Sequence, residues 1–381
     1  MKYRRFGRLD WEVSALGFGA MRLPVIDNDP SRINEPEAIK MIRYAFDHGV
    51  NYIDTAWLYH SGNSEGVVGR ALNKGYREKV KLATKLPARI VQTADDFDRF
   101  LNEQLTRLQT DHIDFYLLHG LNKASWPKLR DLDVFNWAES AISDGRIGYL
   151  GFSFHDEYEV FKEIIDAYDR WTLCQIQYNF MDTEYQAGSK GLRYAAEKGL
   201  AVVIMEPIRG GQLANKLPED VVRLWEAAPK RQSPAEWALQ WVWNQPEVST
   251  VLSGMTLMAH VIENVAAADR SGPNVLTDDD LSLIDQVKEE YRKRSLIPCT
   301  NCRYCLPCPN SVNIPGIFGL YNDAMTFDDL RRARFLYPIR IEEDERAGHC
   351  IECKECEELC PQEIAISEWI KKARELLEEN S

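Results

Sequence analysis

The sequence predicts an α/β protein with two domains, a closed (β/α)8 barrel in residues 1–270 and a smaller all-α domain in residues 271–381. Two observations support this. Short apolar runs alternate with amphipathic stretches through the first part of the chain, and eight of the nine cysteines fall between Cys299 and Cys360. A chain of 381 residues has room for a barrel of about 250 residues and an additional domain.

Eight apolar runs in the first 270 residues are the expected barrel strands. They are SALGFGAMRL, VNYIDTA, KVKLATK, IDFYLLH, RIGYLGFSF, CQIQYNF, AVVIMEP and VSTVLSG. Runs such as IDFYLLH and AVVIM lack strict alternation, which indicates strands covered on both faces, as in a parallel sheet with helical crossovers. Amphipathic stretches such as EAIKMIRYAFDHG lie between them. Eight β/α units of this kind predict a closed TIM barrel.

Residues that start and stop secondary structure agree with this order. The opening YRRFGRLDWEV has an Arg-Leu-Asp turn between two short alternating runs, which predicts a hairpin before the first barrel strand. Asn34 precedes Glu35-Pro36-Glu37 as a helix cap, and Gly49 ends that helix. Ser233-Pro234 opens a tryptophan-rich helix in the same way.

Charge and composition narrow the classes of partner. The net charge of −13 disfavours nucleic acid and anionic membrane surfaces, because either would need a basic face. No apolar run reaches the roughly 18 residues of a membrane span. The opening MKYRRFGRLD has no apolar signal core, and Cys174 is the one cysteine before residue 299. We therefore expect a cytoplasmic protein in a reducing compartment.

The clustered cysteines form two runs with the spacing of iron–sulfur ligands. They read Cys299-x2-Cys302-x2-Cys305-x2-Cys308-Pro and Cys350-x2-Cys353-x2-Cys356-x3-Cys360-Pro. Three cysteines at intervals of three, with a fourth followed by proline, predict a [4Fe–4S] cluster. In two-cluster ferredoxins the fourth cysteine of each run binds the other cluster. We expect one cluster on Cys299, Cys302, Cys305 and Cys360, and the other on Cys308, Cys350, Cys353 and Cys356.

Other uses of these cysteines fit less well. Two Cys-x2-Cys pairs supply the four ligands of a zinc site, so the third cysteine of each run would be surplus. Disulfides do not suit a chain so poor in cysteine elsewhere. The first run departs from the bacterial ferredoxin spacing, since only Leu306 and Pro307 separate its third and fourth cysteines.

Four polar residues stand at the ends of expected strands, where the chemistry of such barrels is found. Asp54 ends the second strand and Tyr59 lies in the loop after it, while Lys85 closes the third strand and His119 the fourth. Each alone has an ordinary structural explanation, such as a solvated charge or a packed ring. Together they suit proton transfer, because an ammonium lowers the pKa of a neighbouring phenol and a carboxylate keeps that ammonium charged. We expect Lys85 and Asp54 to activate Tyr59, and His119 to polarise a carbonyl oxygen.

The segments DTAWLYH, LATK and LLHG, together with the barrel pattern, resemble the aldo-keto reductase family over residues 1–270. The resemblance implies a nicotinamide cofactor, NADP or NAD, bound extended across the barrel mouth without a Rossmann fold. It implies hydride transfer to a small carbonyl substrate, or from the matching alcohol, with Tyr59 as the general acid. It also implies cofactor contacts by Ser153, Gln175, Gly210, Gly211, Ser253, Gly254, Glu263 and Asn264.

Three regions depart from the family pattern and leave the cofactor open. Phe154 stands where relatives carry an asparagine that binds the carboxamide, and Glu206 stands about where many carry an aromatic residue that stacks on the nicotinamide. Gly254 and His260 occupy the stretch that usually holds a lysine and an arginine. A ribose 2′-phosphate needs cationic or bidentate partners. NADP, NAD and a flavin in the same mouth therefore all remain candidates.

The C-terminal segments CTNCRYCLPCPNSVNIPGIF and HCIECKECEELCPQEIAI resemble α-helical ferredoxin domains, so the whole chain is similar to ferredoxin-containing aldo-keto reductases. A nicotinamide takes two electrons as a hydride, whereas a [4Fe–4S] cluster passes one at a time. Four functions stay open. They are an NAD(P)H-linked reductase with an accessory ferredoxin domain, a reductase fed by its own clusters through a flavin or an external electron carrier, an electron relay with a non-catalytic barrel, and a zinc-binding regulatory protein.

Overall fold

The computed structural model describes residues 1–299 and 301–378. Contacts within the chain divide it into two compact units. The first contains Met1–Leu213 and Gln232–Leu281, and the second contains Ala214–Arg231 and the chain from Ser282 onward. The domain boundary at residue 270 stays a prediction, because a division by contacts does not test which segment folds alone.

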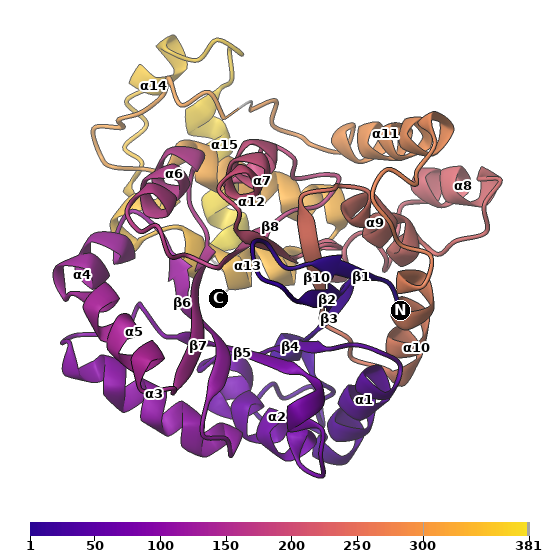
Figure 1. The fold of residues 1–381 in the computed structure, drawn as a ribbon. Coiled ribbons are helices and arrows are strands. Elements are labelled where there is room, and N and C mark those ends of the chain that lie inside the picture. The colour runs from indigo at the N-terminus through magenta and orange to yellow at the C-terminus, as the bar shows by residue number, and fades with distance from the viewer. Residues whose placement is uncertain (300, 379–381) are drawn as a thin grey trace. The chain divides into compact units, whose positions relative to one another are not determined.

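In the first unit, eight parallel strands close into a barrel, as predicted (Figure 1). Around the barrel the order is β10-β3-β4-β5-β6-β7-β8-β9. The strands are β3 (Leu16–Gly19), β4 (Tyr52–Asp54), β5 (Lys81–Leu86), β6 (Ile113–Leu121), β7 (Ile147–Phe154), β8 (Leu173–Gln177), β9 (Ala201–Met205) and β10 (Val248–Ser253). Each predicted run overlaps one of these strands, as expected because a strand covered on both faces needs a continuous apolar run.

Helices surround the strands of the barrel (Figure 1). They are α1 (Glu35–Asp47), α2 (Ser64–Leu72), α3 (Asp95–Leu108), α4 (Ser125–Asp131), α5 (Val134–Ser143), α6 (Tyr158–Asp166), α7 (Gly188–Glu197), α9 (Pro234–Trp243) and α10 (Met258–Ala268). Ser233 caps α9 as predicted, because its hydroxyl accepts a hydrogen bond from the backbone N–H of Glu236 at 3.0 Å. Asn34 precedes α1 as predicted, but its side chain makes no capping hydrogen bond within the described residues.

The predicted N-terminal hairpin is confirmed. Strand β1 (Tyr3–Arg5) pairs antiparallel with β2 (Glu12–Ser14). Phe6, in the turn, packs with its ring centroid 4.7 Å from that of Phe115 inside the barrel. Phe6 and Val13 belong to the same buried cluster as the barrel interior, so the hairpin seals the barrel at the end opposite the polar residues described next.

Strand side chains alternate between the two faces of a sheet, and this alternation builds the barrel interior in layers. Inward-facing apolar residues form the core of the barrel, among them Tyr52, Ala83, Leu117, Leu173 and Val203. The residues two positions further along the same strands are Asp54, Lys85, His119, Gln175 and Met205. Because side chains on one face of a strand recur at every second residue, these five residues form one layer at the carboxyl ends of the strands, directly next to the apolar core.

The second unit is all-α, as predicted for the C-terminal domain. It contains α8 (Glu219–Ala227), most of α11 (Asp278–Arg292), α12 (Ile314–Phe327), α13 (Leu330–Arg340), α14 (Glu355–Glu358) and α15 (Ile366–Leu377). Its small apolar core includes Ile317, Phe318 and Tyr337. Asn313 caps α12 and Asp329 caps α13, by accepting backbone hydrogen bonds at 3.2 and 3.1 Å. Across both units, none of the described helices is long and apolar enough to cross a membrane.

Candidate functional site

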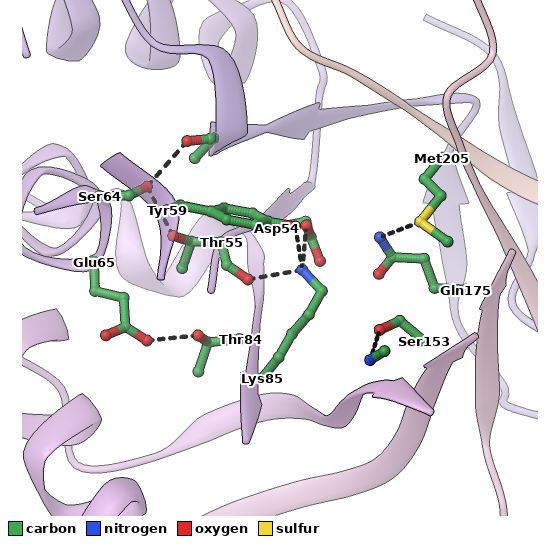
Figure 2. Close-up of polar contacts among 12 residues, drawn as sticks. Asp54, Thr55, Tyr59, Ser64, Glu65, Thr84, Lys85, Ser153, Gln175 and Met205 are labelled. Atoms are coloured by element: carbon green, nitrogen blue, oxygen red, sulfur yellow. Dashed lines mark hydrogen bonds and ion pairs between the residues drawn. The ribbon is translucent and has the colours of Figure 1, made fainter. Parts of the chain in front are cut away.

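The site at the barrel mouth is organised around Lys85, whose side chain is completely buried (Figure 2). Its Nζ donates to Asp54 Oδ1 at 2.6 Å, to the carbonyl oxygen of Thr55 at 2.8 Å and to the hydroxyl of Tyr59 at 3.3 Å. Asp54 ends β4, which is the neighbour of β5 that carries Lys85. The sheet itself therefore brings the ion pair together, and three acceptors satisfy the three N–H groups of the buried ammonium.

Tyr59 and His119 are the members of this group that are partly exposed. Their rings meet edge to face, with centroids 5.9 Å apart and an interplanar angle of 82°. The loop that carries Tyr59 is held by its neighbour His60, whose Nε2 accepts from the backbone N–H of Leu23 at 3.0 Å and whose Nδ1 bonds to the carbonyl oxygen of Pro30 at 2.8 Å. The four residues expected from the sequence thus lie together, two buried and two within reach of a ligand.

Burial and charge set the protonation of these groups. Burial opposes the charge on Lys85, but Asp54 and Tyr59 outweigh it and raise the pKa of Lys85. Burial also raises the pKa of Tyr59, which outweighs the opposite effect of Lys85. The expectation of a lowered Tyr59 pKa is therefore wrong for the net shift, because a phenolate at this partly buried position is poorly solvated. Burial, Lys85 and His155 hold the pKa of His119 well below its usual value, so its ring is neutral at neutral pH.

A buried polar network lies behind Lys85. Glu65, near the start of α2, accepts from Thr84 Oγ1 at 2.7 Å and from Gln104 Nε2 at 2.6 Å. Gln104 also donates to the carbonyl oxygen of Lys85 at 3.0 Å, and Arg107 pairs with Glu65 at 3.3 Å. The network ties β5 to α2 and α3 and so fixes the strand end that carries Lys85. Sequence reasoning missed it, because a glutamate and a glutamine on amphipathic helices look like ordinary surface residues.

Ser153 and Gln175 face the Lys85 group across the mouth (Figure 2). Ser153 Oγ accepts from the backbone N–H of Gly120 at 2.7 Å, which leaves its own hydrogen to donate. Gln175 Nε2 lies 3.8 Å from Met205 Sδ, and Gln175 Oε1 is buried without a partner among the described residues. Such an acceptor costs about 1–3 kcal/mol. A ligand carboxamide, like that of a nicotinamide, would supply the N–H that Gln175 lacks, so the residues present fit this group.

The other predicted cofactor contacts lie in the loop after β9, at or just after the end of β10, or on α10. They are Gly210, Gly211, Ser253, Gly254, Glu263 and Asn264. The two glycines after β9 have φ of 66° and 104°, a backbone region that favours glycine. Ser253 Oγ accepts from Asn264 Nδ2 at 3.0 Å, and the carboxylate of Glu263 accepts from the hydroxyl of Ser233 at the start of α9. The polar side chains of this set therefore bond within the protein.

Two features of the mouth were not expected from the sequence. Met205, rather than Glu206, lies against Gln175 (Figure 2). Glu206 instead pairs with Arg22, with 3.0 Å between Nη2 and Oε1. The alternation along β9 was the available signal for Met205, since this residue stands two positions after the inward-facing Val203.

In the second unit, the first group of thiols combines Cys299, Cys302 and Cys305 with Cys360 of the other run. Burial, followed by the thiols of Cys299, Cys302 and Cys360, raises the pKa of Cys305 to about 11. Burial and the neighbouring Cys302 and Cys360 also raise the pKa of Cys299. Such electrostatic coupling requires short distances, so the structure brings together the set that the spacing predicted.

The second group combines Cys350, Cys353 and Cys356 with Cys308. Burial and these three neighbours raise the pKa of Cys356 to about 12. All four cysteines line one small pocket, together with apolar side chains that include Ile314 at the start of α12 and Ile366 and Ile370 on α15. Cys308 thus reaches this group in spite of the shorter spacing of its run. Among residues 1–299 and 301–378, no three or more His, Cys, Asp or Glu side chains are placed to hold a single metal ion.

The comparison with protein families decides the identity of the barrel. The model described as "Aldo/keto reductase family" matches residues 15–289. The chain belongs to the aldo/keto reductase family. A second model, "4Fe-4S dicluster domain", matches residues 298–366. This aldo/keto reductase therefore carries a 4Fe-4S domain after its barrel.

Relatives and solved structures are similar to this aldo/keto reductase over 69–77% of its length. "Probable aldo-keto reductase 1" of Glycine max is 27% identical over 300 residues, 69% of this chain and 83% of its own. The "NADH-specific methylglyoxal reductase" of Escherichia coli (strain K12) is 26% identical over 340 residues, 77% of this chain and all of its own. Aldo-keto reductase AKR11C1 from Bacillus halodurans in its holo form has a TM-score of 0.62 and 30% identity, covering 75% of this chain and 96% of its own. An aldo-keto reductase from Klebsiella pneumoniae in complex with NADPH has a TM-score of 0.61 and 26% identity, covering 75% and 95%.

Proposed function

We propose that this aldo/keto reductase reduces a small carbonyl compound, or oxidises the matching alcohol, at the group formed by Asp54, Tyr59, Lys85 and His119. The observation that carries the proposal is the buried Lys85, whose ammonium bonds to both Asp54 and Tyr59. Burying a charged lysine is costly, and here the charge is aimed at a phenol that reaches the mouth. A titratable group held in this way is typical of a proton-transfer site.

The chemistry follows from two neutral hydrogen-bond donors. Tyr59 keeps its proton at neutral pH and His119 is a neutral imidazole, so both side chains can donate to one carbonyl oxygen. A reduced nicotinamide, when bound, supplies the hydride that the carbonyl carbon accepts. As charge develops on the oxygen, the Tyr59 O–H bond breaks and a new O–H bond forms on the substrate. The tyrosinate beside the Lys85 ammonium is stabilised by that charge and regains a proton from solvent.

A nicotinamide dinucleotide is the proposed cofactor of the barrel. Ser153 and Gln175 would hold its carboxamide, and the glycine-containing loops after β9 and β10 would contact the rest. The names of two relatives support this class of cofactor, since the Klebsiella protein was solved with NADPH and the Escherichia coli protein is named NADH-specific. NADPH and NADH are therefore the two forms to compare.

For the C-terminal domain we propose two [4Fe–4S] clusters, one on each group of four cysteines. The grouping of the thiols and the pocket that the second group lines support this assignment. Clusters of this type pass single electrons. The presence of two such groups in one chain favours a second candidate function, a reductase that draws electrons from its own clusters. That function requires a flavin or an external carrier to join one-electron and two-electron chemistry.

The proposal is tested with purified protein under anaerobic conditions, using methylglyoxal as the probe substrate with NADPH and NADH separately. We expect oxidation of one nucleotide that depends on the carbonyl and falls about 10²–10⁴-fold in Tyr59→Phe, with the iron content unchanged. Turnover that survives in Tyr59→Phe would refute the proposed role of the phenol. Turnover that requires a flavin or dithionite instead of a nucleotide would favour the second candidate.

A further inference from the structure

The carboxylate of Glu65, on α2, joins two separate elements of the proposed active site. Its side chain is 0% exposed, and its two oxygens have different partners. Oε1 accepts from Thr84 and Gln104, whereas Oε2 accepts from Arg107. Burial raises the pKa of Glu65, and these donors oppose that effect. Because a buried carboxylate is costly unless donors surround it, a group held in this way calls for an explanation.

The contacts of Oε1 hold the main chain at Lys85. Thr84, the residue before Lys85, donates its hydroxyl to this oxygen at 2.7 Å. Gln104 of α3 donates to the same oxygen at 2.6 Å and to the carbonyl oxygen of Lys85 at 3.0 Å. The hydroxyl of Tyr116 on β6 donates to Gln104 Oε1 at 2.6 Å, which orients the amide. Two paths from one carboxylate oxygen of Glu65 therefore meet at the strand end that carries Lys85.

The contact of Oε2 reaches the loop that carries Tyr59. Arg107 of α3 pairs with Glu65 at 3.3 Å, and the Cζ atom of Arg107 lies 3.7 Å from the ring centroid of Trp57. A Cβ built on Gly62 would lie 3.8 Å from Arg107 Nη1. Trp57 precedes Tyr59 by two positions, and Gly62 ends the 3-10 helix η2 (Tyr59–Gly62). Arg107 therefore lies against the loop on both sides of Tyr59.

The loop needs such support, because its backbone is strained. His60 and Ser61, which directly follow Tyr59, have φ of 54° and 55°. This left-handed conformation costs a residue with a side chain roughly 1–2 kcal/mol, and it persists only where the surroundings hold the chain. The ring of His60 supplies part of that support through its two hydrogen bonds. The contacts of Arg107 supply another part.

We propose that Glu65 is a positioning residue for the proton transfer, because it holds the end of β5 and the loop of Tyr59 at the separation that their hydrogen bond requires. The register of β4 and β5 already fixes Asp54 relative to Lys85, whereas Tyr59 lies outside the sheet. The bond from Lys85 to Tyr59, at 3.3 Å, is also the longest of the three that Lys85 donates. The inference rests on the proposed function, since it takes Tyr59 as the proton donor.

The kinetic test uses Glu65→Gln. A glutamine side chain has one acceptor oxygen in place of two, so the variant loses either the contacts of Oε1 or that of Oε2, whichever way its amide turns. We expect kcat for carbonyl reduction to fall about 10-fold to 100-fold at an unchanged KM for the nucleotide. The double variant Glu65→Gln with Arg107→Met should fall no further than the larger single effect, because both changes act through one hydrogen bond. Independent structural losses would add instead.

The direct test places 3-fluorotyrosine at position 59 of the full-length protein and follows its fluorine resonance against pH, without cofactor or substrate. The charged and titratable groups that act on this phenol are Lys85 on β5, Asp54 on β4, His119 on β6 and Glu206 after β9. Because the ammonium of Lys85 favours ionisation, a phenol farther from it titrates at higher pH. Glu65→Gln should therefore move the titration up, by about half a pH unit, whereas the mere loss of a negative charge would move it down.

Asp114→Asn is the matched control. Asp114 is also buried, 5% exposed, and its carboxylate accepts from Lys81, from Arg77 and from the backbone N–H of Leu82 at 2.7, 2.8 and 3.0 Å. It holds the same strand, β5, but at the opposite end. The variant should lower the free energy of unfolding and leave both the fluorine titration and kcat unchanged.

The outcomes separate this inference from the function on which it rests. A titration that stays in place or moves down in Glu65→Gln, or that moves equally in Asp114→Asn, would overturn the positioning role, even if Tyr59→Phe abolishes carbonyl reduction. An upward shift in a protein that reduces no carbonyl would support the role of Glu65 and refute the proposed function. Thr84→Val removes one contact of Oε1 without a change of charge and should move the titration in the same sense, so it replaces Glu65→Gln if that variant does not fold.

Discussion

The barrel mouth and the cysteine groups hold their reactive side chains in different ways. At the mouth, Asp54 and Lys85 stand on adjacent strands, fully buried, and hydrogen bonds within the protein connect them. In the second unit the cysteines lie outside the long helices, Cys302 and Cys353 are exposed, and the apolar core beside them is small.

The difference lies in what fixes each site. Strand register and a large core determine the position of a residue at the mouth before any ligand binds, which is the preorganisation that proton transfer needs. Thiols on loops are held in place largely by the metal that they bind, and metal binding is then part of the folding free energy. We therefore expect a mouth that is formed without its cofactor and a second unit that depends on its clusters.

The variant with the largest expected effect on the barrel mouth is Lys85→Met. Turnover should fall about 10²–10⁴-fold, and the free energy of unfolding should drop by about 3 kcal/mol, because Asp54 becomes a buried charge without a partner. Turnover is measured with the nucleotide assay and stability by chemical denaturation. The double variant Asp54→Asn with Lys85→Met is the control, since it should recover stability but not turnover. Unchanged turnover in Lys85→Met would contradict the role of the ammonium.

In the second unit, Cys356→Ser is expected to cause a loss of iron and of structural protection. The variant should lose half of the iron, and protease should cut the C-terminal unit about tenfold faster, because the cluster contributes to the folding of its own site. Iron analysis and limited proteolysis followed by mass spectrometry measure both. Cys174→Ala, in the barrel strand β8, is the control and should keep all of the iron. Full iron and full protection in Cys356→Ser would show that the second unit, too, is fixed by the protein alone.

Gln175→Leu tests whether the barrel mouth is formed before the nucleotide binds. Affinity for the nicotinamide nucleotide should fall about tenfold, which corresponds to about 1.4 kcal/mol. Stability without nucleotide should be unchanged or higher, because the variant removes a buried acceptor that has no partner among the described residues. Nucleotide titration and denaturation are measured together. Gln240→Leu on α9 is the matched control, because Gln240 is equally buried and its Oε1 also has no partner among residues 1–299 and 301–378, and it should leave affinity unchanged.

The smallest expected effect is a pH dependence of stability at the mouth. His119 has a pKa well below its usual value, chiefly through burial, so the unfolded chain takes up a proton near pH 6.5 that the folded chain does not. The contribution of His119 is present above about pH 6.5 and declines below it, by at most about 1.4 kcal/mol per pH unit. His60 contributes with the same sign. The test is to measure the free energy of unfolding from neutral to mildly acidic pH by denaturation. Its slope against pH is then compared between the parent protein and His119→Gln. Equal slopes would mean that the His119 side chain is solvated in the folded protein as it is in the unfolded chain.

Much of the barrel could be predicted because its signals are local. A strand buried on both faces needs a run such as AVVIM, and the end of such a run marks the carboxyl end of a strand, where Asp54, Lys85 and His119 were found. The cysteine spacing likewise predicts the grouping of the thiols, since the first three cysteines of each run are separated by only two residues and the fourth binds the other cluster in two-cluster ferredoxins.

The features that the sequence did not reveal depend on distance and burial. Arg22 and Glu206 are 184 positions apart, and neither has a motif that refers to the other. The charge of Lys85 indicated a lowered Tyr59 pKa, but the burial that reverses the net shift is a property of the folded mouth. The segment 214–231 belongs by contacts with the C-terminal unit although it lies between β9 and α9, which no local pattern indicates.

The measurement that tests the account most directly is anaerobic mixing of the as-isolated protein with NADH or NADPH, before and after a carbonyl is added. The near-ultraviolet band of the nucleotide and the visible band of the clusters are followed together. The account predicts loss of the nucleotide band only when the carbonyl is present, with the cluster band unchanged. Bleaching of the clusters in step with the nucleotide, without any carbonyl, would contradict it and show that electrons pass between the two parts of the chain.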